Sequence, residues 1–306
     1  MQLYLLEMFT VVVESRRVTA AAKLLNLTQP AVSQQIRQLE GYFGVQLLTR
    51  GNQGVEPTPA GRIVYRHAKQ MLAQFDCMER EIDDLMEEDA REVMVGATPT
   101  VGNFVVPCSL WTFKERFPKA EVRLEVGSGS EMAERVLDRS LHMAIIEGSV
   151  PGHVASAAGV KSRVIAGDYL VMVTLADSPW AGERLTTATL QVAPLILPGR
   201  GMGMREPFDC GLDRLGLKLQ NLLVKAQLGG LEGMKSALES YGGVMVCTRM
   251  SVQKELKRES YREVTPEDWE VKVPFHLVCM EETLPPVARR FIRFVAAPEE
   301  LASCWT

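Results

Sequence analysis

The stretch 19–40 constrains the fold of this chain most, because it holds two short helical patterns separated by a tight turn. Three consecutive alanines at 20–22 are small enough to let two helix backbones approach closely. An apolar wedge follows them, made of Leu24, Leu25 and Leu27. Thr28 can cap a second helix by accepting a hydrogen bond from its first backbone N–H groups, and Pro30 suits the first helical turn. We therefore expect a helix-turn-helix over this stretch.

The second helix of this pair has an apolar face and a polar face. The apolar positions recur at spacings of four, three and four, at Val32, Ile36, Leu39 and Phe43. The polar positions are Gln29, Ser33, Gln34 and Arg37. Glutamine pairs with adenine and arginine with guanine in the major groove of DNA, so this face is a candidate reader of base edges. A solvated polar face on an ordinary surface helix is the alternative.

Two short extended runs follow this helix and flank a turn-forming segment at 51–54, Gly-Asn-Gln-Gly. The pattern predicts a small β-hairpin, or wing, beside the helices. Arg50 lies at the base of this wing, where a guanidinium is placed to hold a DNA phosphate without reading sequence.

Thr58 followed by Pro59 is typical of a helix N-terminus, and we expect a long helix from there to about residue 89. Along it, apolar residues alternate at spacings of four and three, at Val64, Ala68, Met71, Phe75, Met78, Ile82 and Leu85. This heptad pattern predicts a seam between two copies of the helix, which would present two reader helices to the half-sites of a pseudo-palindrome. The alternative is an amphipathic helix packed on its own chain.

Charge is distributed unevenly along the chain, whose formal net charge is −4. Residues 1–70 carry eight basic and four acidic side chains, whereas residues 71–92 carry two basic and nine acidic ones. The positive charge is therefore local to the proposed reader, where release of counterions favours DNA binding. Because the excess is modest, we expect one module to bind weakly and dimerisation to be needed for useful affinity.

From residue 92 the pattern changes to alternating strands and helices. Three strands, at 93–97, 122–126 and 142–146, are separated by helices at 103–117 and 131–139. A second set has strands at 169–174, 194–197, 221–226 and 244–247 and helices at 206–215 and 231–241. The chain closes with a strand at 271–280 and a helix at 286–296. This order predicts an α/β domain wound around a parallel sheet.

The chain resembles the LysR-type transcriptional regulators. The resemblance rests on one long, gapless motif: Ala21, Ala22, Leu24, residues 27–33, Ile36, Leu39, Glu40, residues 44–48, Arg50 and residues 58–61. It extends more loosely to about residue 296. It implies an α/β protein with an N-terminal all-α winged helix-turn-helix and a two-lobed effector domain like the type 2 periplasmic binding proteins. It also implies double-stranded promoter DNA and a small-molecule effector as partners, with dimers that pair into a homotetramer.

We accordingly divide the chain into a DNA-binding domain at 1–58, a linker and dimerisation helix at 59–89 and an effector domain at 90–306. Lobe I is expected at about 90–165 and 270–300, and lobe II at about 166–269. The candidate DNA contacts are Thr28, Gln29, Pro30, Ser33, Gln34, Arg37, Arg50 and Thr58.

Ligands of open α/β sheets bind beyond the carboxyl ends of the strands, where helix N-termini point. Three strand-to-helix turns qualify, at 98–100, 128–130 and 199–205, and the resemblance places effector contacts at the first and third. The candidate effector contacts are Thr98, Thr100, Ser128, Ser130, Glu147, Arg200, Met202 and Met204. The hydroxyl groups in the first two turns are equally suited to capping helices.

The third turn departs from the family, in which a Gly-Ser-Gly-Thr-Arg run is frequent, whereas residues 201–205 are Gly-Met-Gly-Met-Arg. Thioethers are apolar and poor acceptors, and a carboxylate at Glu147 would repel an anion. Arg200 and Arg205 still supply positive charge. We therefore expect an effector with an apolar or aromatic portion and at least one charged group, and no tight binding of sulfate or phosphate.

Other protein classes find less support in the sequence. No apolar run approaches the roughly 18–20 residues that cross a bilayer, and no secretory leader pattern begins the chain, so we expect a cytoplasmic protein without membrane contact. Six cysteines lie far apart and without metal-ligand spacing, at 77, 108, 210, 247, 279 and 304. We expect reduced thiols, with a redox-sensing pair as the open alternative.

We expect neither a cofactor nor catalytic activity, because the sequence contains no nucleophile elbow, nucleotide-binding loop or metal constellation. The alternative function is a cytosolic solute-binding protein, or a metabolic enzyme domain, with an appended helix-turn-helix. A gel shift with the native upstream DNA separates these readings, because only a regulator should retard a specific fragment.

Overall fold

The computed structural model describes residues 3–25, 27–51, 54–84, 92–182 and 184–296. The chain forms two compact units. The first comprises Met1–Glu92, Thr112–Glu121 and Arg290–Thr306, and the second comprises Val93–Trp111 and Val122–Arg289. Among the described residues, every helix is too short or too polar to span a bilayer.

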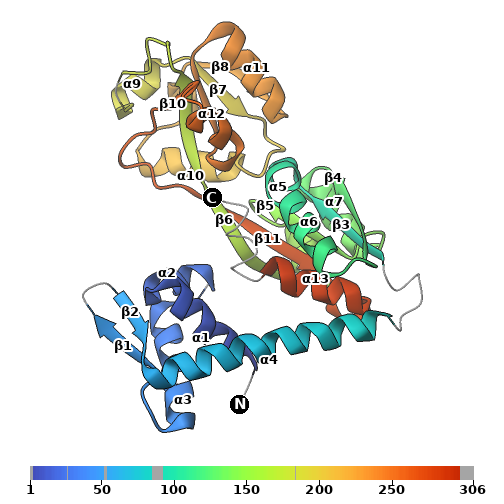
Figure 1. Ribbon diagram of the computed structural model, residues 1–306. Helices are drawn as coiled ribbons and strands as arrows, with labels where there is room; N and C mark the ends of the chain where they lie inside the picture. The colour runs from blue at the N-terminus through green and yellow to red at the C-terminus, as the bar shows by residue number, and fades with distance from the viewer. Residues whose placement is uncertain (1–2, 26, 52–53, 85–91, 183, 297–306) are drawn as a thin grey trace. The chain divides into compact units, whose positions relative to one another are not determined.

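The N-terminal part of the first unit is a winged helix-turn-helix followed by a long helix (Figure 1). Its elements are α1 Leu3–Ser15, α2 Val18–Leu24, α3 Gln29–Phe43, β1 Leu48–Gly51, β2 Gly54–Pro57 and α4 Pro59–Asp84. The predicted helix pair, wing and long helix are confirmed, whereas α1 was not predicted. Met8 and Phe9 of α1 are fully buried in the same apolar cluster as Ala21 and Ala22, so the small alanines do sit at a helix contact.

The loop between α3 and the wing is fixed by two residues of specific chemistry. Gly44 ends α3 with a φ of 67°, a left-handed conformation that favours glycine. The Glu40 carboxylate accepts hydrogen bonds from the backbone N–H groups of Leu47 (2.9 Å) and Leu48 (3.2 Å). The hairpin then forms by antiparallel pairing of β1 with β2, with Arg50 opposite Val55.

The start of α4 is locked to the end of the α3 loop. The Thr58 hydroxyl donates to the carbonyl oxygen of Gln46 (2.8 Å) and accepts from the backbone N–H of Gly61 (2.9 Å). A Cβ atom on Gly61 would lie 2.0 Å from the carbonyl oxygen of Leu47, so only glycine permits this close approach. The segment 58–61 therefore sets the position at which the long helix leaves the wing.

From residue 92 onward the chain contributes one sheet of nine strands (Figure 1). Its first elements are β3 Glu92–Ala97, α5 Pro99–Phe104, α6 Val106–Arg116, β4 Glu121–Val126, α7 Gly129–Leu137, β5 Met143–Glu147 and α8 Gly152–Ala155. The strands that follow are β6 Lys161–Leu175, β7 Leu195–Pro198, β8 Val224–Leu228, β9 Val244–Thr248, β10 Tyr261–Glu263 and β11 Lys272–Cys279. The helices that follow are α9 Thr187–Val192, α10 Arg205–Arg214, α11 Leu231–Tyr241, α12 Gln253–Lys257 and α13 Pro286–Ala296. Of the helices in this part, the end of α6 and most of α13 belong to the first unit.

The strand order β4-β3-β5-β11-β6-β9-β7-β8 divides the sheet into two halves joined by β11 and β6. Pairing is parallel between β3 and β5 and between β7 and its neighbours β8 and β9. It is antiparallel where β11 meets β5 and β6, and where β6 meets β9. The prediction of a parallel sheet is therefore wrong at the centre of the sheet. There the long strand β6 and the returning strand β11 are antiparallel and connect the two halves.

Two further expectations need correction. The helix expected at 103–117 begins earlier, because Pro99 suits a first helical turn. It is also divided into α5 and α6 at Val105. The strand expected at 221–226 begins only at Val224, because Leu219–Asn221 forms a short 3-10 helix.

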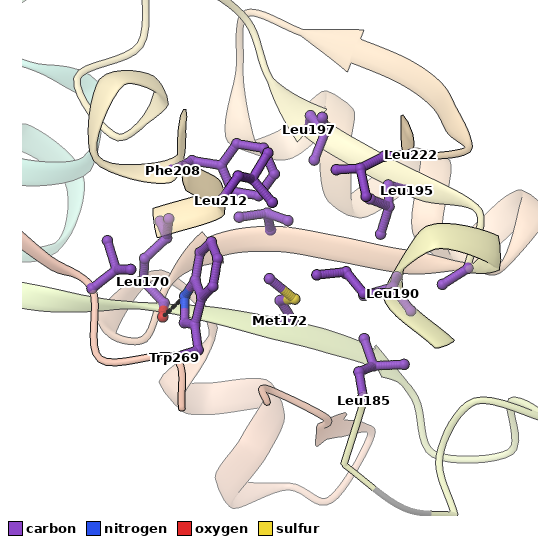
Figure 2. Close-up of a cluster of buried hydrophobic side chains, with 14 of the residues drawn as sticks. Leu170, Met172, Leu185, Leu190, Leu195, Leu197, Phe208, Leu212, Leu222 and Trp269 are labelled. Atoms are coloured by element: carbon purple, nitrogen blue, oxygen red, sulfur yellow. Dashed lines mark hydrogen bonds between the residues drawn. The ribbon is translucent and has the colours of Figure 1, made fainter. Parts of the chain in front are cut away.

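The half of the sheet that contains β7 and β9 has its own apolar core (Figure 2). Phe208 from α10 contacts Trp269, with ring centroids 5.7 Å apart. The indole N–H of Trp269 donates to the carbonyl oxygen of Leu170 on β6 at 3.1 Å, so its polar atom is satisfied inside the core. This core holds the turn before α10, which carries several of the candidate effector residues, against the sheet.

Candidate DNA-binding surface and effector pocket

Helix α3 separates its two predicted faces in the structure. Val32 and Leu39 are fully buried and Ile36 is nearly so, and these side chains anchor one face of α3 in the apolar core of the winged helix-turn-helix. Phe43 was expected on this face, but its side chain is exposed, because it lies in the last turn before Gly44 redirects the chain. Apolar spacing alone did not show where the helix would end.

The predicted reader residues lie on the opposite, solvent-facing side of α3. Gln29, Pro30, Gln34 and Arg37 are exposed, and Ser33 is half-buried. Thr28 is the N-cap, and its hydroxyl accepts from the backbone N–H of Ala31 at 3.3 Å. The polar face is therefore both accessible and held in a fixed orientation by the buried face behind it.

The two other candidate DNA contacts occupy the wing and its base. Arg50 lies on β1, and its side chain lies outside the described part of the structure. Thr58 is half-buried and its hydroxyl already has two backbone partners, Gln46 and Gly61. Its first role is therefore to cap α4.

Two cations beside the wing lie outside the set of contacts predicted from the sequence. Arg16 and Arg17 are exposed in the turn between α1 and α2. The carbonyl oxygen of Arg16 accepts from the backbone N–H of Val55 on β2 at 2.7 Å, so this turn is tied to the wing. The positive charge of the first 70 residues was the only sequence signal that could have pointed to them.

The apolar seam of α4 changes character along the helix. Val64 and Ala68 pack against the core of the winged unit. Met71 and Met78, further along, are 48% and 47% exposed. The side chain of Ile82 and the whole of Leu85 lie outside the described residues. The packed-helix alternative thus applies at Val64 and Ala68, whereas Phe75 is half-buried and Met71 and Met78 are exposed.

A pocket of about 150 Å³ lies at the ends of strands from both halves of the sheet. It is lined by Thr98, Gly129, Ser130, Glu147, Ser149, Arg200, Gly201, Met202, Gly203 and Glu206. Five of the eight predicted effector residues are among them: Thr98, Ser130, Glu147, Arg200 and Met202. The structure therefore brings the first, second and third strand-to-helix turns to one cavity.

Close backbone contact between the two halves forms one side of this pocket. A Cβ atom on Gly203 would lie 1.9 Å from the carbonyl oxygen of Glu147, and Gly148 has a φ of +82°. The Ser149 hydroxyl donates to the Glu206 carboxylate at 2.5 Å across the same junction. Neither Ser149 nor Glu206 was predicted from the sequence, since both lie just outside the turns that strand patterns identify.

Glu147 is the most unusual side chain of the pocket. It is 2% exposed, and its Oε1 atom has no hydrogen-bond partner within the described part of the chain. Burial raises the pKa of its carboxyl group to about 7, a hydrogen bond with Thr100 opposes the shift, and the nearby Asp168 carboxylate adds to it. The Thr98 hydroxyl accepts from the backbone N–H of Glu147 at 2.9 Å and fixes the strand end.

Three predicted effector residues do not line the pocket. Met204 is fully buried in the core around Phe208, because it immediately precedes α10 and its side chain packs inward. Ser128 caps α7 by accepting from the backbone N–H of Glu131 at 3.2 Å, which is the capping alternative. Thr100 is 2% exposed and lies behind Glu147 as its hydrogen-bond partner.

Arg205 does not supply free positive charge. Its guanidinium donates to Asp209 (3.1 Å), to the carbonyl oxygen of Pro198 (3.1 Å) and to Gln227 (2.8 Å), and the residue is 4% exposed. Arg200, by contrast, is exposed and forms no ion pair among the described residues. Because Met202 is the one apolar side chain in the described lining, the pocket gives no support to an aromatic effector.

None of the described cysteines lines this pocket. Cys77, Cys210, Cys247 and Cys279 are free, whereas Cys108 is disulfide-bonded, which corrects the expectation of reduced thiols at that position. Sequence spacing excludes only local pairing of cysteines, not pairing in the fold. Cys304 lies outside the described residues. Within the described ranges, no group of three or more His, Cys, Asp or Glu side chains is arranged to hold a metal ion.

Known sequences and structures match both parts of the chain. Residues 3–62 match the family model described as "Bacterial regulatory helix-turn-helix protein, lysR family", and residues 86–298 match the "LysR substrate binding domain". The HTH-type transcriptional regulator YeiE of Escherichia coli K12 is 31% identical over 259 residues, covering 85% of this chain and 84% of the relative. The nitrogen assimilation regulatory protein nac of the same organism is 28% identical, covering 79% of this chain and 76% of the relative.

Solved structures share the fold. CbnR, described as a LysR family transcriptional regulator, superposes with a TM-score of 0.57 at 23% identity and covers 96% of this chain and 100% of its own. DarR of Vibrio fischeri, solved in complex with DNA, has a TM-score of 0.55 at 18% identity and covers 97% of this chain and 98% of its own. With a winged helix-turn-helix at its N-terminus and a two-half α/β domain that encloses a pocket, this chain belongs to the LysR family of transcriptional regulators.

Proposed function

We propose that this LysR-type regulator binds pseudo-palindromic promoter DNA as an oligomer and is controlled by a small molecule in the pocket between the halves of the sheet. The observation that carries the proposal is the two-faced α3 helix. Its buried side, Val32 and Leu39, holds the helix in place, while Gln34 and Arg37 face solvent with side chains suited to base edges.

The proposed contacts fall into two classes. Gln29, Ser33, Gln34 and Arg37 would read base edges from the major groove. A second set would hold the DNA backbone, and consists of Thr28, Pro30, Arg50, Thr58, Arg16 and Arg17. Contacts of the second class position the module without reading sequence. CbnR has been solved with its target DNA, and its fold matches this chain with a TM-score of 0.55, which supports the same mode of binding here.

We propose that two copies dimerise through α4 and that dimers pair into a tetramer. Exposed Met71 and Met78 are separated by seven residues, the heptad spacing of a two-helix seam. The two α3 helices of one dimer would then bind two half-sites. The weak electrostatic attraction of one DNA-binding domain to DNA would be supplemented by that of the second.

Control by an effector requires that it bind two arrangements of the protein with different affinity. The pocket draws its walls from both halves of the sheet, so a ligand there would favour one relative placement of these halves over another. This change would alter how the α3 pairs are held on DNA. We propose a cytoplasmic regulator without catalytic activity, because promoter DNA is its target.

A gel shift tests the function. The full chain is mixed with the DNA upstream of its own gene and with a shuffled fragment of equal length and composition. We expect retardation of the upstream fragment at a protein concentration that leaves the shuffled one free, since specific binding is typically ~10³-fold or more tighter than non-specific binding. Equal retardation of both fragments would contradict a sequence-reading function.

A further inference from the structure

The charges that line the pocket are unequal. Two carboxylates, Glu147 and Glu206, line it together with a single guanidinium, that of Arg200. A third carboxylate, that of Asp168, opposes the ionisation of Glu147, and the guanidinium of Arg205 is already bound to Asp209. A site with this balance attracts a positively charged group and disfavours a simple anion.

The fold does little to stabilise the ionised form of the Glu147 carboxyl group. A buried carboxylate is stable when hydrogen bonds or a cation replace its lost water. Here Oε1 has no partner among the described residues, and the only side chain that hydrogen-bonds the carboxyl group is Thr100. An ammonium group that reached the Glu147 carboxyl group from the pocket would supply the missing donor and charge, as charge-assisted hydrogen bonds do.

The opposite wall offers the complementary chemistry. Arg200 is exposed and unpaired within the described residues, and the Ser130 hydroxyl lines the same pocket. Gly129 and Ser130 begin α7, where the first backbone N–H groups of a helix have no partner within it. A guanidinium, a hydroxyl and a helix N-terminus together suit a carboxylate or another small anionic group.

We propose that the effector is a small zwitterionic amino compound, whose ammonium group binds Glu147 and whose anionic group binds Arg200 and the start of α7. The inference rests on the proposed function, in that it assigns the chemistry of the same pocket. A cavity of about 150 Å³ holds a molecule of the size of benzene, roughly six non-hydrogen atoms. Alanine has this size and both charges.

The experiment is a calorimetric titration of the full chain at about pH 8, where Glu147 is ionised. The first probe is alanine, which carries both charges. Propionate carries only the negative charge, ethylamine carries only the positive charge, and sulfate is an inorganic anion. We expect alanine to bind more tightly than each of the other three. In the Glu147→Gln variant, alanine should bind about 10- to 100-fold more weakly, because a hydrogen bond between charged partners is lost.

The matched control is Glu232→Gln, which removes an exposed carboxylate from α11, away from the pocket lining. It should bind alanine like the wild type. An absence of alanine binding, equal binding by Glu147→Gln, or a preference for propionate or sulfate would each overturn the inference. Retardation of the upstream DNA fragment is measured on the same samples: if it persists, only the effector class is wrong, and if the wild type lacks it, the proposed function is wrong.

Discussion

Glu147 is unfavourable for folding as it stands, and the proposed effector site rests on it. Its carboxyl group is almost completely removed from water and lacks a partner for Oε1 among the described residues. Neighbouring Asp168 opposes its ionisation, and Arg200 and Glu206 are the other charged groups that line the pocket. In the proposed site, a ligand would supply the hydrogen bond and the charge that the fold does not.

Removal of this charge should make the stability of the protein less dependent on pH. The pKa of Glu147 rises from 4.5 to about 7 on folding, so the native state holds the proton more tightly and its stability falls as pH rises through this window. Between about pH 5.5 and 8, the wild type should lose about 2 kcal/mol that Glu147→Gln retains. Urea unfolding of both proteins at these two pH values measures the difference, and parallel pH profiles would refute it.

Arg37 and Arg50 should differ in how they affect DNA binding. Arg37→Ala should cost about 1–3 kcal/mol on the preferred site and relax selectivity at one base position, because a guanidinium is suited to guanine. Arg50→Ala should weaken binding to all sequences alike and reduce its salt dependence. Competition binding on single-base variants of the site, at two salt concentrations, separates the two roles. Unchanged selectivity in Arg37→Ala would exclude it as a reader.

Two glycines in the winged helix-turn-helix and its long helix differ in whether their surroundings require glycine. Gly61 lies where α4 meets the carbonyl oxygen of Leu47, and a Cβ atom there would be 2.0 Å from that oxygen. Gly41, inside α3, has no atom within 4 Å of its added Cβ. One glycine is therefore required by packing and the other is only a weak point of a helix.

Substitution of each glycine by alanine tests this distinction. Gly61→Ala should destabilise the protein by about 1–3 kcal/mol, because backbone atoms must move apart. Gly41→Ala should stabilise it by about 0.5–1 kcal/mol, since alanine favours helix. Thermal unfolding of the two variants gives the signs, and a stabilising Gly61→Ala would show that the close approach has little importance.

The exposed seam of α4 predicts the oligomeric state. Met71→Glu places a charge in the apolar seam and should raise the dissociation constant of the dimer by at least about tenfold, a cost of roughly 1.4 kcal/mol. Ala73→Glu is the matched control, since Ala73 is exposed and lies on the opposite side of the helix. Sedimentation velocity over a range of concentrations measures both. If the two variants associate equally, the dimer does not use this seam.

Across the whole molecule, the sequence predicted most accurately the helices whose ends and faces depend on residues close together in the chain. Thr28, Pro30 and the spacing of Val32, Ile36 and Leu39 located α3, and the ends of α11 and α13 agree with the expected 231–241 and 286–296. Strand direction at the centre of the sheet was not predictable, because β6 and β11 pair across about a hundred residues and no local pattern specifies which way they run.

The pocket was predictable in outline but not in detail. Strand-to-helix turns identified Thr98, Ser130 and Arg200, whereas Met204 failed because only packing decides which of two similar thioethers turns inward. Ser149 and Glu206 come together from residues 57 positions apart, which no sequence motif records. The DNA-binding module was therefore predictable from sequence, whereas the set of residues that line the pocket required the structure.

Hydroxyl-radical footprinting of the full chain on its upstream DNA shows whether paired α3 helices read a pseudo-palindrome. We expect two protected half-sites related by a dyad, with their centres about 10–10.5 base pairs or a multiple of this apart. Protection of a single unpaired site, or of no defined site at concentrations that saturate the fragment, would contradict it.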